Sequence, residues 1–226
     1  MKQDHIWTYY QNEAPEVFAG SVYRLRHLAA RIAPISKVLN IGVGTGLFEK
    51  LAAERGLDVY CVDPDGKAID SVRLRLGLGD RARVGYAQDL PFEDGLFDAV
   101  VASELLEHLT ERELDASLEE IRRVLKPGGI FIGTVPAREN LSDQMVVCPK
   151  CGERFHRWGH KQGFDPERLQ ELLSPHFCVE EIKEVYFIPW KLLNWKGVIV
   201  EILRQIPRLF GGRISGANFV FSAAKP

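Results

Sequence analysis

Long apolar runs are missing from this sequence of 226 residues, and it contains only four cysteines and two methionines. A membrane-spanning helix needs about 20 predominantly apolar residues, so we predict none. The first 18 residues contain no charged segment followed by an apolar core, which argues against a secretion signal. Four cysteines without such a signal indicate a reducing compartment, and we expect a cytoplasmic protein.

A strong charge of either sign is also missing. The formal net charge is -2, so nothing favours nucleic acid as a partner. An apolar fraction of 46% is sufficient for one large domain with a substantial core. No internal repeat or low-complexity linker divides the chain. We therefore expect a single domain over residues 1–226, with an N-terminal helical cap (1–35), an inserted loop with Cys and His (141–164) and an apolar helical insertion (188–212).

Segments with the pattern of buried strands alternate with segments of helical periodicity. The expected strands are 37–43, 57–65, 81–87, the start of 97–109, and 130–137; the expected helices are 47–56, 66–77 and 113–129. This alternation predicts an α/β fold with a parallel sheet covered by helices on both faces. In such folds the ligand binds beyond the carboxyl ends of the strands.

Three glycines, Gly42, Gly44 and Gly46, follow the first expected strand. Their G-x-G-x-G spacing is one residue shorter than the dinucleotide fingerprint, so the loop suits a nucleoside better than a pyrophosphate. Asp63 ends the second expected strand, where a carboxylate can accept hydrogen bonds from both hydroxyls of a ribose. A helix N-cap is the alternative role, and Asp65 fits it better.

The third expected strand leads to Asp89 and Leu90. A carboxylate at this position can accept a hydrogen bond from the amine of adenine, with apolar neighbours against the ring. A simple turn residue is the alternative for Asp89.

Four segments together resemble the successive motifs of class I S-adenosylmethionine-dependent methyltransferases, most closely the broad small-molecule group. They are VLNIGVGTG, VDPD, AQDLPFEDGLFDAVVASELLEHL and RRVLKPGGIFIGTVP. The resemblance covers about residues 36 to 136 and resumes weakly at 163–173. It implies a Rossmann-like, doubly wound, seven-stranded sheet of order 3-2-1-4-5-7-6 with strand seven antiparallel. Residues 177–187 would form strand six, and 217–226 strand seven.

By position, the resemblance also implies roles for individual residues. Asp63 would hold the ribose of the cofactor, the three glycines would lie against its methionine part, Asp89 and Leu90 would lie at the adenine, and Ser103 and Glu104 would line the methyl-transfer site.

Asn40 departs from the family, which usually has an acid at this position. An amide keeps an acceptor and adds donors, but it lacks a negative charge that would favour the cationic cofactor. We expect Asn40 to contact the cofactor, with weaker binding. The departure keeps open a cofactor-binding scaffold without turnover. A nucleotide-dependent oxidoreductase is a third alternative, disfavoured by the glycine spacing.

Methyl transfer from a sulfonium requires mainly alignment of the acceptor and exclusion of water. A base assists when the acceptor is a hydroxyl or an acidic carbon. The candidate bases are Glu104, Glu107, His108 and His160. For His108 the alternatives are a surface position or a group that orients Glu104.

A second pattern, C-x2-C-x4-H-x3-H, is formed by Cys148, Cys151, His156 and His160. Two thiolates and two imidazoles suit tetrahedral zinc, so we predict a structural zinc knuckle resembling the CPxCG type. The alternatives are a surface loop with two free cysteines and a redox pair. His160 could instead face the acceptor site.

The remaining two cysteines, Cys61 and Cys178, lie in apolar, strand-like segments and are expected in the core. Residues 188–212 are apolar, with tryptophans and scattered basic residues. They would pack against the sheet or a partner subunit, or lie on a membrane as an interfacial helix that admits a lipid-linked acceptor. The acceptor is therefore expected to be a small molecule or a lipid-linked one.

Overall fold

A computed structural model describes the chain except residues 1–8, 10–12, 14–19, 189–193 and 210–215. Its main feature is a seven-stranded sheet of order β3-β2-β1-β4-β5-β9-β8. The strands are β1 (Lys37–Ile41), β2 (Asp58–Asp63), β3 (Ala82–Val84), β4 (Phe97–Ser103), β5 (Leu125–Pro136), β8 (Cys178–Val185) and β9 (Asn218–Ala224). Strand β9 runs antiparallel to both of its neighbours, β5 and β8, whereas the other neighbouring strands of this sheet pair in parallel. The predicted sheet order, with an antiparallel last strand, is therefore confirmed.

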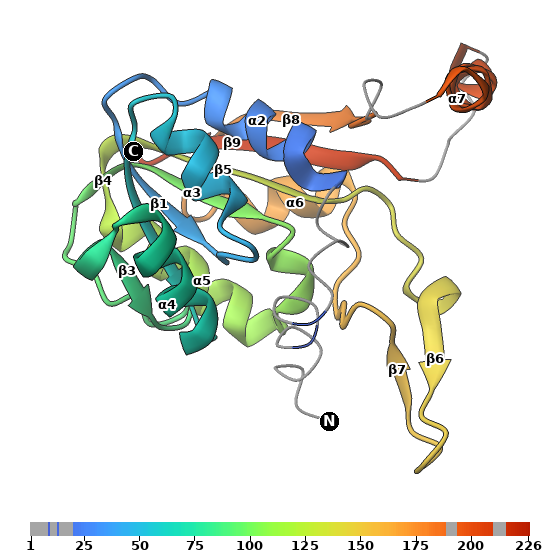
Figure 1. The fold of residues 1–226 in the computed structure, drawn as a ribbon, viewed down its shortest axis with the longest axis horizontal. Helices are drawn as coiled ribbons and strands as arrows, with labels where there is room; N and C mark the ends of the chain where they lie inside the picture. Colours follow the sequence, from blue (N-terminus) through green and yellow to red (C-terminus); the bar gives the residue numbers. More distant parts are fainter. Residues whose placement is uncertain (1–8, 10–12, 14–19, 189–193, 210–215) are drawn as a thin grey trace.

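Helices cover both faces of this sheet (Figure 1). They are α2 (Val22–Ala30), α3 (Leu47–Ala53), α4 (Gly66–Leu76), α5 (Glu111–Val124) and α6 (Pro166–Leu173), with short 3-10 helices η2 (Gly79–Arg81), η3 (Leu106–His108) and η4 (Leu141–Gln144). Successive residues of β1 belong to different hydrophobic clusters. Val38 shares a cluster with residues of α2 and α3, and Leu39 shares one with residues of α5 and α6. Both faces of β1 are thus buried, as expected of a parallel sheet.

Several element boundaries differ from the sequence expectations. The third strand ends at Val84 rather than at residue 87, and the segment after β4 contains the short 3-10 helix η3. Helix α5 begins earlier than predicted, because Thr110 and Glu113 form a capping box at its N-terminus. It ends at Val124, directly before β5.

The two predicted core cysteines differ in burial. Cys61 is fully buried in β2, as predicted. Cys178, by contrast, is exposed, and the core prediction for it is wrong. The reason is that β8 lies at the edge of the sheet, and Cys178 is its first residue.

Three segments lie outside this layered body or only partly within the described residues. About half of the expected cap over 1–35 lies outside the described residues, and its described part contains α2 packed on α3. Strands β6 (Met145–Val147) and β7 (Arg154–His156) form a separate hairpin. Helix α7 (Trp195–Leu209) stands away from the sheet, at the upper right of Figure 1. In the described part of the chain, no helix has the length and apolar character needed to cross a membrane.

Candidate functional site: a cleft at the carboxyl ends of the strands

The register of β1, β2 and β4 places the three loops that follow these strands beside one another at the same edge of the sheet. Ile41 of β1 pairs with Val62 of β2 on one side and with Ala102 of β4 on the other. The residues at 42–46, 63–65 and 103–105 therefore lie together where these three strands end. Here a cavity of about 550 Å³ is lined by these three loops, by residues 85–88 after β3 and by part of α2. This is the position expected for a ligand site in a doubly wound sheet.

The glycine loop presents bare backbone to this cavity. Gly42, Gly44 and Gly46 have φ angles of 90°, 53° and 77°, a conformation that suits glycine and few other residues. A β-carbon at Gly46 would also lie 2.9 Å from Cγ2 of Val72, so this glycine permits close packing of the loop on α4. Gly42 and Gly44 line the cavity and face open space, as a backbone cradle for a ligand requires.

Asp63 is only 3% exposed and has a fixed orientation at the end of β2. Its Oδ2 accepts a hydrogen bond of 2.8 Å from the Val43 amide, and its Oδ1 accepts one of 2.8 Å from the Asp65 amide. A carboxylate oxygen can accept more than one hydrogen bond, so this side chain can also receive a pair of ribose hydroxyls. Asp65 caps α4 through the amides of Lys67 and Ala68, as predicted.

The cavity wall after β3 differs from the prediction. It is formed by Gly85, Tyr86, Ala87 and Gln88. Among the described lining residues neither Asp89 nor Leu90 occurs, since Asp89 points to solvent in a tight turn and Leu90 is buried in the core. The structure therefore does not bring Asp89 and Leu90 into the described cavity wall, where the resemblance had placed them at the adenine. Because β3 ends earlier than expected, Tyr86 and Gln88 occupy the position beside the cavity.

Beneath the glycine loop, Asn40 is joined to an acid that the sequence analysis missed. Asn40 lines the cavity, and its Nδ2 donates to Oε1 of Glu49 at 2.6 Å and to the Gly42 carbonyl at 3.0 Å. Glu49 has no solvent exposure, and burial raises its pKa to about 7. The amide at position 40 thus has a carboxyl partner behind it.

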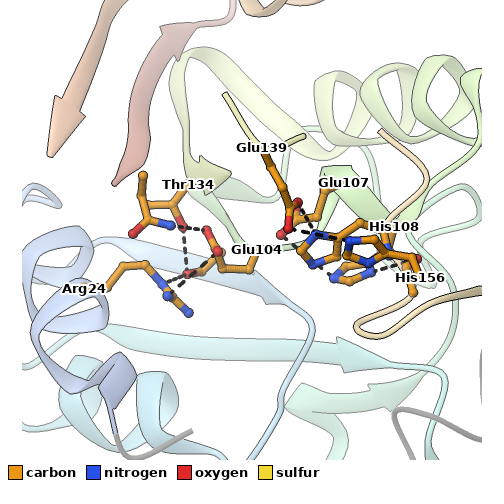
Figure 2. Close-up of polar contacts among 11 residues, drawn as sticks. Arg24, Glu104, Glu107, His108, Thr134, Glu139 and His156 are labelled. Carbon is orange, nitrogen blue, oxygen red and sulfur yellow. Dashed lines mark hydrogen bonds and ion pairs between the residues drawn. The ribbon is translucent and has the colours of Figure 1, made fainter. Parts of the chain in front are cut away.

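At the other end of the cavity, polar contacts fix the orientation of Glu104 (Figure 2). Its Oε1 accepts a hydrogen bond of 3.0 Å from Nδ2 of Asn218, and its Oε2 lies 3.9 Å from Nη1 of Arg24. Arg24 also donates to Oγ of Ser103 at 3.0 Å, and that hydroxyl contacts Oγ1 of Thr134 at 3.0 Å. The backbone of Glu104 has a φ of 56°, a strained value for a non-glycine residue that is frequent at functional sites.

A cluster of histidines and carboxyls adjoins this end of the cavity (Figure 2). His108 lines the cavity, and burial together with the nearby His160 lowers its pKa to about 3. Glu107 is fully buried, and its pKa is raised well above the ordinary value by burial and by Glu104. The His108 and His160 rings are 4.7 Å apart, and Nδ1 of His160 pairs with Glu139. His160 does not line the cavity among the described residues, so its predicted place in the acceptor site is indirect.

The predicted zinc knuckle is not assembled. Cys148 and Cys151 lie at the turn of the β6–β7 hairpin, whereas His156 ends β7 opposite Met145. Figure 1 shows the hairpin reaching away from the sheet. In the described part of the chain, no group of three or more possible ligands includes either cysteine. The four-ligand set is therefore corrected: antiparallel pairing puts the thiols at one end of the hairpin and the histidines at the other.

Comparison with known proteins finds relatives that are named as methyltransferases. Residues 39–133 match the methyltransferase domain family. An uncharacterized methyltransferase of Synechocystis sp. is 36% identical over 100 residues, which are 44% of this chain and 47% of that protein. An uncharacterized methyltransferase of Mycobacterium bovis is 35% identical over 97 residues, 38% of its length. This chain thus spans less than half of these two relatives.

A longer match covers most of both chains. The ubiquinone biosynthesis O-methyltransferase of Xanthomonas campestris pv. campestris is 35% identical over 179 residues, 74% of each protein. The fold also matches that of the 1,6-didemethyltoxoflavin-N1-methyltransferase of Burkholderia thailandensis, with a TM-score of 0.69, 18% identity and coverage of 99% and 86%. The glycine loop, the Asp63 carboxylate and this 35% identity agree, and the chain belongs to the class I S-adenosylmethionine-dependent methyltransferases.

Proposed function

We propose that this protein transfers the methyl group of S-adenosylmethionine to a hydroxyl oxygen of a small-molecule or lipid-linked acceptor. The observation that carries the proposal is the continuity of the cavity. One space of about 550 Å³ extends from the glycine loop and Asp63 to Glu104 and His108. Donor and acceptor can therefore occupy adjacent positions with little water between them.

The donor end of the cavity suits a nucleoside with an amino-acid tail. Asp63 would hold the ribose hydroxyls, Tyr86 and Gln88 would lie beside the base, and the backbone at Gly42 and Gly44 would contact the methionine part. The bound cofactor supplies an electrophilic methyl group on a sulfonium ion. The protein orients the cofactor and surrounds its sulfonium ion with negative charge.

The acceptor end contains a carboxylate that can receive a proton. Asn218 and Arg24 hold the Glu104 side chain from two sides, so its oxygens have a defined direction. A hydroxyl acceptor beside Glu104 would lose its proton to this carboxylate as the oxygen attacks the methyl group. With a pKa lowered to about 3, the neighbouring His108 is neutral near pH 7 and adds no positive charge.

The apolar surface of α7 supports a lipid-linked acceptor. Trp195, Ile199, Leu203 and Ile206 are 70%, 48%, 57% and 41% exposed. Their spacing of three or four residues places them along one side of the helix. An exposed apolar stripe in a helix that begins with Trp and Lys is typical of a helix lying on a membrane surface.

The experiment that tests this function follows the methyl group. The purified protein is incubated with S-adenosylmethionine carrying a radiolabelled methyl group and with an extract of its host, and the products are fractionated. We expect label in the lipid fraction or among soluble small molecules. Label in protein or nucleic acid would contradict the acceptor class. Tight cofactor binding without any labelled product would favour a non-catalytic scaffold, and NADH binding without S-adenosylhomocysteine binding would favour an oxidoreductase.

A further inference from the structure

Beside the acceptor end of the cavity, five side chains form a polar cluster that methyl transfer leaves largely unused. Glu107 and His108 come from η3, Glu139 follows β5, and His156 and His160 lie at and after the end of β7. Figure 2 shows Glu107, Glu139, His108 and His156 converging from these separate segments. Residues distant in the sequence are thus brought to one buried place.

Glu107 is the unusual member of this cluster. Its side chain has no solvent exposure, and neither Oε1 nor Oε2 has a hydrogen-bond partner within the described structure. Leaving a buried carboxyl without partners is costly, and native proteins usually pair such groups or bind a metal with them. Two imidazole rings adjoin this carboxyl, since one ligand atom each of Glu107, His108 and His160 lie within 4.8 Å of one another.

Both histidines next to Glu107 have partners that leave one ring nitrogen available as an acceptor. Nδ1 of His108 lies 3.4 Å from the Gly159 carbonyl, and with its proton there Nε2 carries the lone pair. This Nε2 lies 3.9 Å from Oε1 of Glu107. Nδ1 of His160 pairs with Glu139, and a donor at Nδ1 likewise leaves the lone pair on Nε2. A carbonyl or carboxylate behind the imidazole is the usual support of a metal-binding histidine.

The second triad in the cluster, Glu139 with His156 and His160, is less suited to metal binding. Nδ1 of His156 accepts a hydrogen bond of 3.1 Å from the His160 amide, so the proton of a neutral ring lies on Nε2. That nitrogen faces Oε1 of Glu139 at 3.7 Å. His156 and Glu139 therefore act as supports for His160.

We propose that Glu107, His108 and His160 bind a divalent transition metal ion of the zinc type. Two imidazoles and one carboxylate are a donor set that zinc accepts, and three protein ligands leave one position for water or a substrate oxygen. Because His108 also lines the cavity, the metal would lie in its wall. Metal binding at this site does not depend on the proposed methyl transfer. Binding of an acceptor oxygen at the fourth coordination position does rest on that proposed function.

Cobalt substitution distinguishes this site from one at the cysteines. The full-length protein, stripped with a chelator, is titrated with Co²⁺ and followed by visible absorption. We expect about one Co²⁺ per chain, with d–d bands but without a thiolate-to-cobalt charge-transfer band, and competition by Zn²⁺. The double variant Cys148→Ser/Cys151→Ser should bind Co²⁺ as the wild type does.

Substitutions then assign the ligands. Glu107→Gln and His160→Gln should each lose the bound Co²⁺, with S-adenosylhomocysteine affinity and thermal unfolding showing that the fold persists. Glu139→Gln, which alters a support and not a ligand, should weaken Co²⁺ binding about 10- to 100-fold and retain the stoichiometry. Unchanged Co²⁺ binding in folded Glu107→Gln, a charge-transfer band that Cys148→Ser abolishes, or no bound Co²⁺ in the wild type would each overturn the proposal.

Discussion

The Asn40 amide donates a 2.6 Å hydrogen bond to Oε1 of Glu49, a carboxyl that is fully buried beneath the glycine loop. The family usually has an acid at position 40, and here an amide and a deeper carboxyl stand together. Asp63 raises the pKa of Glu49 further, because a second negative charge nearby disfavours ionisation. The charge beneath the cofactor site is therefore set by the protonation of Glu49.

Glu49 should make folding stability depend on pH. Its pKa is about 7 in the folded protein and near 4.5 when unfolded, so the folded state binds the proton more tightly. The bound proton stabilises the folded protein fully below about pH 4.5. This stabilisation, about 3 kcal/mol of unfolding free energy, is lost as the pH rises through 7. Glu49→Gln should remove this slope and be the more stable protein above pH 7. Urea unfolding over this pH range tests it.

The matched control for this experiment is Glu54→Gln. Glu54 follows α3 and is exposed, so its neutralisation should leave the slope unchanged. A Glu49→Gln profile that parallels the wild type would show that Glu49 titrates normally.

Asp63 and Asp89 should differ sharply in their effect on cofactor binding. Asp63 lies in the cavity wall and is almost fully buried, whereas Asp89 is exposed and outside that wall. Losing a charged partner of two ribose hydroxyls costs about 1.5–3 kcal/mol, so Asp63→Asn should weaken S-adenosylhomocysteine binding at least tenfold. Asp89→Asn should bind as the wild type does. Calorimetric titration measures both affinities, and equal losses would support a role of Asp89 at the adenine.

Glu104→Gln tests the proposed base. The amide keeps an oxygen that can accept the hydrogen bond from Asn218, but it cannot take a proton. We expect kcat to fall about 100-fold or more with unchanged S-adenosylhomocysteine affinity. If the Glu104→Gln variant kept the full kcat, the acceptor would have to give its proton to a group other than Glu104.

Leu203→Ser should weaken binding of the protein to lipid vesicles. Leu203 is 57% exposed on α7, and burying a leucine side chain in an apolar phase contributes about 1.5–3 kcal/mol. Sedimentation with anionic vesicles should show about a tenfold lower affinity. Leu74→Ser is the control, because Leu74 is 86% exposed on α4 and undergoes the same chemical change. Equal affinity of both variants and the wild type would exclude α7 as a membrane contact.

The strands and helices were predictable because they depend on signals within single segments, whereas the order of the strands followed only from the resemblance of four segments to the methyltransferase motifs. Buried strands, helical periodicity and the positive-φ glycines at Gly42 and Gly46 all occur in the local sequence. Asp63 could be placed for the same reason, as it directly follows the apolar core of β2. The position of Asp89 outside the described cavity wall could not be foreseen, because it depends on the end of β3 to within two residues, and that strand has only three residues.

Other parts of the site depend on contacts between distant segments. The spacing of Cys148 and His156 is compatible with a zinc knuckle, but it does not reveal that a hairpin separates them. Glu139 lies outside the motifs. Glu107 lies within the third one and was a candidate base, but only the packing of η3 against the segment after β7 buries it beside His108 and His160. Arg24 reaches Glu104 from α2, across 80 residues of sequence.

A crystal structure of the protein with S-adenosylhomocysteine bound would show directly whether the cavity holds the cofactor. We expect the ribose hydroxyls to contact Asp63, the adenine to lie beside Tyr86 and Gln88, and the sulfur to face the end of the cavity with Glu104. An adenine amine bound to Asp89, or a ligand outside this cavity, would contradict this expectation.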